Sequence, residues 1–313
     1  MTTQENKRPL LQWLLAKFPD TPKTRAKQWI AAGRVSVNGV VIRKPHQVLT
    51  DPGAALQLLD RQATTLDCGK DGWQIHPRVT LLYLDPALAV VNKGPGLLSV
   101  PAENYELSAL TILGDVICGK LPAGRSIPAA YRMLQPLPVH RLDQFTSGVF
   151  CMAMNPSARR RLIDQLQART MHRQYVAYVE GRLKETKGTW RNWLKLSDDQ
   201  LRQFVIPREE PEALEAVTHY EVVTEYKGVT KIRLRLESGR RHQIRVQAAF
   251  AGVPLVGDRT YNPFRRIDFP RQALHAETLS LEHPDRPGAR MTWTAALPKD
   301  MALLESDLRR DRV

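Results

Sequence analysis

The feature that most constrains the fold is an alternating stretch at residues 217–237. Apolar and basic residues take turns from Lys231 to Leu236, and this period of two places apolar side chains on one face of a strand and basic ones on the other. Lys227–Gly228 supplies a turn signal within the stretch, which therefore predicts a β-hairpin. The chain must contain a sheet with one buried face, against which further elements pack.

The remaining strands and helices follow in irregular order, which argues against a doubly wound parallel fold. Because most neighbouring strands are joined as hairpins, we expect an α+β domain with a largely antiparallel or mixed central sheet, flanked by helices and loops. The segments expected as strands are 81–85, 88–92, 148–154, 174–180 and 274–281, and those expected as helices are 104–119, 156–169 and 240–251.

The first 66 residues predict a separate small unit. Leucines at helical spacing in residues 10–18 precede a second helical segment, which starts near Pro22 and ends at Gly33. Asn38–Gly39 then lies between two β-rich arms and is a strong hairpin signal. We expect a small helix-helix-hairpin domain at residues 1–66, a linker rich in glycine and proline at 67–79, and the main domain at 80–313.

The charge of the chain favours a polyanionic partner. Its 46 Lys and Arg residues against 32 Asp and Glu residues give a net charge of +14 and a pI near 9.9, which is typical of nucleic-acid-binding proteins. Residues 1–66 alone carry ten basic and four acidic side chains. These cations can contact a phosphate backbone, although a solvated helix face would have the same composition.

The segment Ala31–Gly39 favours the nucleic-acid interpretation of this unit. It resembles part of the small RNA-binding domain that is named after the fourth protein of the small ribosomal subunit, and the resemblance covers roughly residues 8–60. It implies that the unit binds RNA. The candidate RNA-binding residues here are Lys23, Arg25, Lys27, Arg34, Asn38, Arg43 and Lys44.

Cysteine usage and hydropathy indicate a reducing, cytoplasmic setting. Cys68, Cys118 and Cys151 are widely spaced and form no Cys-x-x-Cys pair, so we expect neither a disulfide framework nor a zinc site. The N-terminus is polar, and no apolar run approaches the about 18 residues that span a bilayer. We therefore expect a soluble protein without a signal peptide or membrane helix.

Two clusters in the main domain are rich in cationic and hydrogen-bonding groups, and one of them holds an aspartate. Val139–Asp143 places one aspartate beside an arginine and a histidine, ahead of Thr146–Val149, and Gly239–Arg245 repeats the mixture of cationic and hydrogen-bonding groups. An aspartate held ionised by an arginine can act as a nucleophile or proton acceptor, but such a pair is more often structural. The sequence has no Walker loop, Rossmann fingerprint or nucleophile elbow, which argues against nucleotide-driven and redox chemistry.

These clusters, taken with other segments, resemble the RluA-type pseudouridine synthases. His140–Asp143 followed by Thr146–Gly148 is similar to the signature that carries the catalytic aspartate of that family. The resemblance covers about residues 80–298, and several ordered motifs are more specific than any one. The other similar segments are Val90–Gly96, Gln174–Gly181, Gly239–Val246 and Leu274–Ala276.

The resemblance implies roles for three residues. Asp143 would be the catalytic carboxylate that attacks or stabilises the sugar or base during glycosidic cleavage. Arg245 would pair with it and keep it ionised and oriented, and Tyr175 would line the site with an aromatic face and a hydroxyl. The implied reaction detaches uracil from ribose, rotates it and rejoins it through a ring carbon, and it requires no cofactor or metal.

The implied substrate is a uridine in a structured ribosomal or transfer RNA, and we expect a monomer with neither a membrane nor a metal as partner. A stacked uridine must be flipped out of the RNA, and Arg141 is expected to fill the vacancy or to grip phosphates. We expect the histidines at 140, 242 and 275 to be structural rather than catalytic. The expected RNA contacts near the site are His140, Arg141, Arg240, Arg241 and Lys93.

Two alternatives stay open on the sequence alone. A non-catalytic RNA-binding or ribosome-assembly factor would share the same fold and charge. A nucleoside hydrolase or base glycosylase would also bring a carboxylate to a ribosyl carbon. The small N-terminal unit and the net charge of +14 favour a macromolecular substrate over a free nucleoside.

Overall fold

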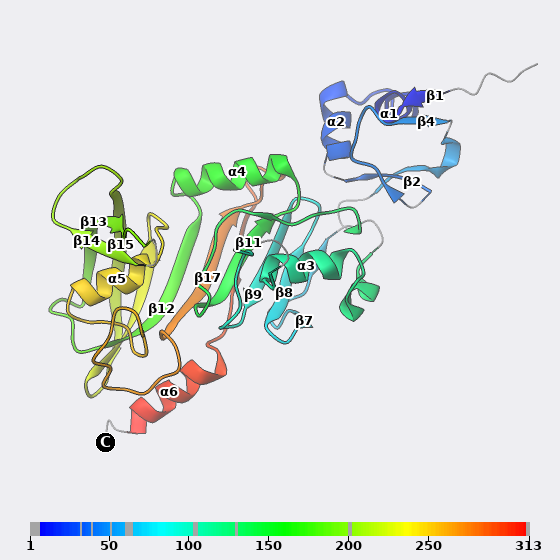
Figure 1. Ribbon diagram of the computed structural model, residues 1–313. Coiled ribbons are helices and arrows are strands. Elements are labelled where there is room, and N and C mark those ends of the chain that lie inside the picture. Colours follow the sequence, from blue (N-terminus) through cyan, green and yellow to red (C-terminus); the bar gives the residue numbers. More distant parts are fainter. Residues whose placement is uncertain are drawn as a thin grey trace, which may run out of the picture.

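The computed structural model describes residues 7–31, 33–38, 40–50, 52–59, 65–102, 106–128, 131–199 and 202–310. A small N-terminal unit, blue in Figure 1, lies outside the large sheet that forms the centre of the main domain. None of the helices in these ranges combines the length and the apolar character that crossing a membrane requires.

The N-terminal unit contains two short helices and two small sheets. Leu10, Leu14 and Ile30 are fully buried and pack against the strands, so the helical spacing of the leucines is what builds this core. The predicted hairpin is confirmed, since Ser36 pairs with Val41. Gly39 of its turn lies outside the described residues. The elements are β1 (Lys7–Pro9), α1 (Leu10–Lys17), α2 (Lys23–Ala31), β2 (Val35–Val37), β3 (Val40–Val41), β4 (Val48–Thr50), the 3₁₀ turn η1 (Gly53–Ala55) and β5 (Leu56–Leu58).

The main domain has thirteen strands in one sheet within the described residues. All pairs are antiparallel except the one between β11 and β17, which confirms the predicted mixed sheet. The strands are β6 (Leu66–Asp67), β7 (Trp73–His76), β8 (Val79–Leu84), β9 (Leu88–Lys93), β10 (Leu137–Pro138), β11 (Ser147–Ala153), β12 (His172–Glu180), β13 (Lys187–Leu196), β14 (Gln203–Ile206), β15 (Leu214–Glu225), β16 (Val229–Leu236), β17 (Leu274–Glu282) and β18 (Arg290–Thr294).

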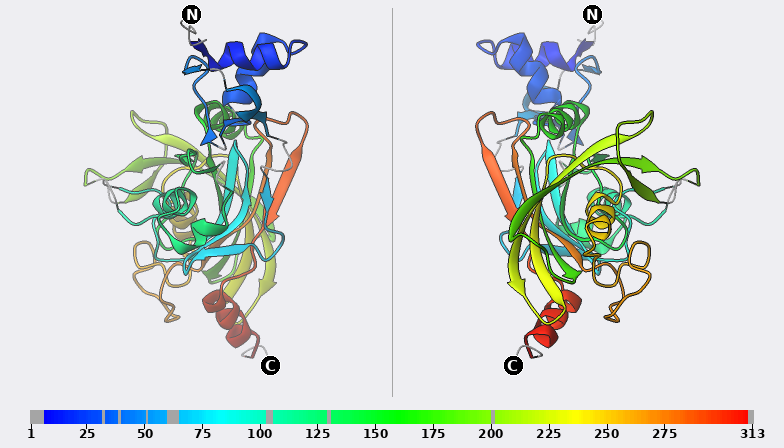
Figure 2. Two further views of the ribbon diagram at one scale, coloured as in Figure 1. Left: turned by 90° about the vertical axis from the view of Figure 1, so that its right-hand side faces the viewer. Right: turned by 90° about the vertical axis from the view of Figure 1, so that its left-hand side faces the viewer.

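Helices cover both faces of this sheet (Figure 2). The apolar side chains of α3 and α5 belong to one core cluster, with the inward-facing residues of β9, β12 and β16. Those of α4 and α6 pack on the opposite face, in two separate clusters. The helices of the main domain are α3 (Ala109–Ile117), the 3₁₀ turn η3 (Pro122–Ser126), α4 (Pro156–Gln167), α5 (Gln243–Phe250) and α6 (Lys299–Arg310).

The alternating stretch at residues 217–237 forms the predicted hairpin. It comprises β15 and β16, and Gly228 turns the chain with a φ of +77°. Ile232 and Leu234 are fully buried, whereas Arg235 on the other face is exposed. The alternation of apolar and basic residues therefore predicts correctly which face of this strand is buried and which is exposed.

The prediction of a linker at residues 67–79 is wrong. Leu66–Asp67 pairs with Leu84 and Tyr83 of β8, and Trp73–His76 pairs with the first half of the same strand. Gly69 and Gly72, which suggested a loop, are turn residues with positive φ between these two short strands. The main sheet therefore begins at Leu66, because the alternation of Trp73 and Ile75 with polar neighbours is a strand pattern that the glycines obscure.

The sheet divides between β11 and β17, and this division positions the candidate site. The two strands pair in parallel only through Ser147 with His275 and Gly148 with Ala276, after which β17 pairs with β18 instead. Gly148 has a φ of +120°, and a Cβ here would lie 2.1 Å from the carbonyl oxygen of Ala276. Only glycine permits this close approach, so the loop that precedes β11 ends at a fixed joint of the sheet.

Candidate active site

The loop at residues 142–147, which carries Asp143, is held by buried polar groups from distant segments. Ser99 bonds both to the amide and to the carbonyl of Leu142, with its Oγ at 3.0 and 2.9 Å. Arg271 donates to the carbonyl of Phe145 over 3.1 Å, and His275 meets the Oγ of Ser147 at 3.0 Å. Because these bonds fix the backbone on both sides, the Asp143 side chain has a defined direction.

Lys93 belongs to the same support and is not an RNA contact, so this part of the prediction is wrong. The side chain is fully buried, and its Nζ donates to the carbonyls of Gly94, Leu97 and Gln144 at 3.0, 2.9 and 3.0 Å. Burial lowers the pKa of Lys93 to about 7, and the nearby charge of Arg271 adds to the effect. A lysine that is closed off in this way cannot reach a phosphate.

Arg245 faces the loop from α5. Its Nε and Nη2 donate to both carboxylate oxygens of Asp258 at 2.7 and 2.8 Å, which leaves Nη1 to donate to Asp143 at 3.3 Å. Burial alone would lower the pKa of Arg245, but the hydrogen bonds and charge of Asp258 and Asp143 raise it overall. The structure thus brings together the two residues that the motifs place 102 positions apart.

Tyr175 lies on β12, where it pairs with Ala276 of β17. Its side chain is nearly buried, with 5% exposed, and it lines the same cavity as Asp143. Burial raises the pKa of Tyr175, so its hydroxyl stays protonated at neutral pH and can donate a hydrogen bond. Asp143 itself is more accessible, because 20% of its side chain is exposed.

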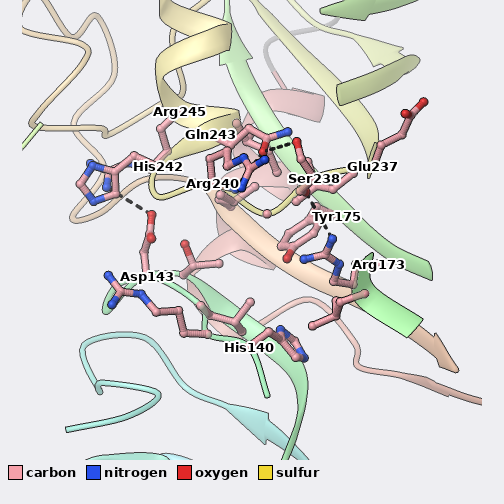
Figure 3. A pocket seen from close by; sticks show the side chains of 18 of the residues that line it. His140, Asp143, Arg173, Tyr175, Glu237, Ser238, Arg240, His242, Gln243 and Arg245 are labelled. Atoms are coloured by element: carbon pink, nitrogen blue, oxygen red, sulfur yellow. Dashed lines mark hydrogen bonds and ion pairs between the residues drawn. The ribbon is translucent and has the colours of Figure 1, made fainter. Parts of the chain in front are cut away.

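These three residues line a cavity of about 530 Å³ (Figure 3), which is large enough for a nucleotide. Five arginines but only two acids, Asp143 and Glu237, line it. A second cavity of about 860 Å³ adjoins Asp143 on its other side and includes Arg141 and Arg241. A strand of nucleic acid can therefore approach Asp143 along a surface rich in arginine. The five arginines of the first cavity are Arg141, Arg169, Arg173, Arg240 and Arg245.

The other predicted RNA contacts near the site differ in their exposure to solvent and in their hydrogen bonds within the protein. Arg141 is exposed beside Asp143, as expected for a residue that meets RNA. Arg240 is also exposed, although its Nε already donates to the carbonyl of Glu215 at 3.1 Å. Arg241 is half-buried in the wall of the second cavity. Arg141 is thus an accessible cation next to the carboxylate.

His140 is half-buried in the wall of both cavities, and its contact with RNA stays a prediction. Its Nε2 accepts a hydrogen bond from the amide of Cys151 at 3.2 Å. Burial, reinforced by the charge of Arg173, lowers the pKa of His140 to about 3, so the ring carries no charge at neutral pH. His242 behaves similarly, because burial lowers its pKa to about 4 while its Nδ1 meets the hydroxyl of Tyr261 at 3.0 Å.

The N-terminal candidates divide into exposed and engaged side chains. Arg34 donates through Nε and Nη2 to the carbonyl of Leu59 at 3.1 Å, and Arg43 donates to the carbonyl of Ala31 at 2.7 Å. These two arginines connect segments of the unit and are less available for RNA. The exposed candidates are Lys23, Arg25, Lys27, Asn38 and Lys44.

Several residues that shape the site are absent from the predicted set. Asp258 holds Arg245, while Ser99 and Arg271 hold the loop of Asp143. No short motif singles them out, because each acts across a contact between distant segments. Burial of charge within an apolar neighbourhood is the only sequence signal, and it is weak. No cluster of three or more metal-binding side chains occurs within the described ranges.

Known proteins share both parts of this architecture. Residues 87–250 match the family described as RNA pseudouridylate synthase, and residues 8–55 match the S4 domain. An uncharacterised RNA pseudouridine synthase of Bacillus subtilis is 31% identical over 96% of this chain and 94% of its own length. A ribosomal large subunit pseudouridine synthase D of Yersinia pestis is 35% identical over 96% of this chain and 90% of its own length.

The fold of the main domain also matches a solved structure. The human protein RNA Pseudouridylate Synthase Domain Containing 4 superposes with a TM-score of 0.58 at 21% identity, over 73% of this chain and 92% of that one. At this identity the likeness concerns the fold alone.

Proposed function

The chain belongs to the RNA pseudouridylate synthase family, and on this premise we propose that it isomerises a uridine of the ribosomal RNA of the large subunit. The ion pair between Asp143 and Arg245 in a nucleotide-sized cavity is the observation that carries the proposal. Relatives named for the large ribosomal subunit support the choice of RNA, because they match this chain over nearly its whole length.

Asp143 is the proposed catalytic carboxylate. It contacts the guanidinium of Arg245 and is partly accessible, and its backbone is fixed on both sides, so it can attack or stabilise the reacting sugar or base as the glycosidic bond breaks. The bidentate contact with Asp258 locks the guanidinium of Arg245, so that Nη1 remains directed at Asp143. In this proposal Arg245 sets both the charge and the orientation of the carboxylate.

Tyr175 is the proposed platform for the detached uracil. Its aromatic ring lines the cavity and can stack against the base while the base turns. Its hydroxyl is protonated, because burial raises the pKa of Tyr175, and it can donate a hydrogen bond to the base or move a proton at the reacting carbon. The reaction rearranges atoms of the substrate itself, and this proposal assigns no cofactor or metal to it.

RNA is proposed to cross both parts of the protein. The exposed cations Lys23, Arg25 and Lys27 on α2 supply contacts with the phosphate backbone, and such contacts add affinity whatever the base sequence. Arg141 fills the place of the flipped uridine or grips its phosphates. We assign the activity to a monomer in the cytoplasm.

Mapping of pseudouridine in cellular RNA tests this function. Ribosomal and transfer RNA from cells with the protein, without it, and with only the Asp143→Asn variant should be compared by chemistry that marks pseudouridine. We expect one or a few marks in the large-subunit RNA to vanish in the latter two. Loss of a transfer-RNA mark alone would assign a different substrate, and no loss anywhere would refute the proposal.

A further inference from the structure

Arg173 is a buried cation in the wall of the active-site cavity. It lies on β12 two residues before Tyr175, and both side chains line the cavity that contains Asp143 (Figure 3). Only 8% of Arg173 is exposed. A guanidinium has five N–H donors and cannot lose its charge in a protein, so burying it without partners is costly.

Within the described part of the chain, only one hydrogen bond from the guanidinium of Arg173 is present. Nη2 donates to the carbonyl of Ser238 at 3.2 Å, whereas Nε is buried and has no partner among the described residues. No carboxylate in these ranges forms an ion pair with Arg173. The two acids of the cavity are engaged elsewhere, since Glu237 pairs with His219 at 2.6 Å and with Arg169, and Asp143 pairs with Arg245.

The chain leaves space for this guanidinium at Gly239. A Cβ built on Gly239 would lie 2.6 Å from Nη1 of Arg173, which is closer than real Cβ atoms come to other atoms. Gly239 is not among the glycines with positive φ, so its backbone does not require glycine. The lack of a side chain at Gly239 therefore leaves room for the guanidinium of Arg173 beside the cavity.

We propose that Arg173 binds a phosphate of the RNA strand next to the uridine that enters the cavity. A bound anion would supply the negative counter-charge that this buried guanidinium lacks. The RNA backbone carries one negative charge at each phosphate linkage. The contact fixes the ribose of the target nucleotide relative to Asp143. This inference rests on the proposed function only in that a uridine of an RNA strand occupies the cavity.

Arg173→Met, which keeps much of the side-chain volume and removes the charge, tests the proposal. Binding is measured by fluorescence with a short RNA hairpin that has a single uridine in its loop. We expect the affinity to fall by about tenfold or more, because a charge-assisted contact is lost. The slope of log affinity against log salt should fall by about 0.7, the amount for one single-strand phosphate.

The stability of the same variant separates binding from a structural role. Since the variant removes an unpaired buried charge from the free protein, its thermal midpoint should stay the same or rise. Arg182→Met is the matched control: it removes the same charge from a side chain that is 71% exposed and paired with Glu225, and it should leave RNA affinity unchanged. A lower midpoint with an unchanged salt slope would overturn the proposal.

Gly239→Ala provides an independent test of geometry. Its Cβ should displace the guanidinium and weaken RNA binding in the wild type, yet add little in the Arg173→Met background. Additive losses in the double variant would contradict the proposal.

RNA with a neutral methylphosphonate beside the loop uridine identifies the bound group. This neutral linkage should remove the difference in RNA affinity between the wild type and Arg173→Met. If the difference persists with the neutral linkage on either side of the uridine, Arg173 does not bind a phosphate. Because binding needs no turnover, this outcome is independent of which RNA the protein modifies.

Discussion

The buried cations around Asp143 and the exposed cations of the N-terminal unit have different roles. Around Asp143, Lys93 and Arg271 are buried, and they donate to backbone carbonyls of the loop that carries Asp143. On α2 of the N-terminal unit, Lys23 and Arg25 are exposed to solvent. The same residue types thus fix geometry where they are covered and add salt-dependent affinity where they are open.

The largest effect expected from this contrast comes from Asp143→Asn. The variant keeps the size and hydrogen bonding of the side chain but removes the charge that Arg245 holds in place. We expect conversion of uridine to fall by at least about a thousandfold while RNA affinity is retained. Product formation and binding should be measured on one RNA, and residual conversion close to wild type would show that Asp143 is misassigned.

The structural work of buried cations is tested by Arg271→Met. Arg271 is 4% exposed, and its Nε and Nη2 contact both oxygens of Asp300 at 2.6 and 3.0 Å. Its loss leaves Asp300 and the Phe145 carbonyl without this donor, so the free energy of unfolding should fall by about 3 kcal/mol.

Arg309→Met is the control for Arg271→Met, because it also breaks an ion pair of α6. Arg309 is 67% exposed where it meets Glu305, so its loss should lower the free energy of unfolding far less than the loss of Arg271. Chemical denaturation measures both variants. Similar losses would mean that burial does not distinguish the two arginines.

The pH dependence of stability tests whether burial lowers the pKa of Lys93. Burial lowers its pKa from 10.5 to about 7 in the folded protein, so between these values the unfolded chain binds more protons than the folded one. The free energy of unfolding of the wild type should therefore rise with pH across this window, relative to Lys93→Met. If the free energy of unfolding varied with pH in the same way for both proteins, a lowered pKa of Lys93 in the folded protein would be excluded.

The smallest effect per residue is expected in the N-terminal unit. Replacing Lys23, Arg25 and Lys27 together by Gln should reduce the salt slope of RNA binding by up to about 2, since each single-strand phosphate contributes about 0.7. The maximal rate of isomerisation should not change. A control with Arg182, Lys227 and Arg310 replaced by Gln loses the same charge, and an equal change in slope there would deny a specific role for α2.

The sequence was most informative where the expected features lie in local motifs. Alternation between Lys231 and Leu236 gave the faces of β16, and the motif clusters named Asp143, Tyr175 and Arg245, which the structure brings to one cavity. It failed at residues 67–79, where glycines in turns between short strands have the same composition as a linker. Composition cannot separate the two cases, because only pairing with β8 distinguishes them.

The sequence by itself determined the periodicity of the strands, the excess of positive charge and the residue types at the candidate active site. Only the tertiary structure decided which charged groups are covered and which are open. The structure buries Lys93 away from RNA and shows that Asp258 holds Arg245. It also shows that Arg173 is buried without a carboxylate partner among the described residues. Burial depends on which distant segments meet at the division between β11 and β17, and local patterns carry no information about such meetings.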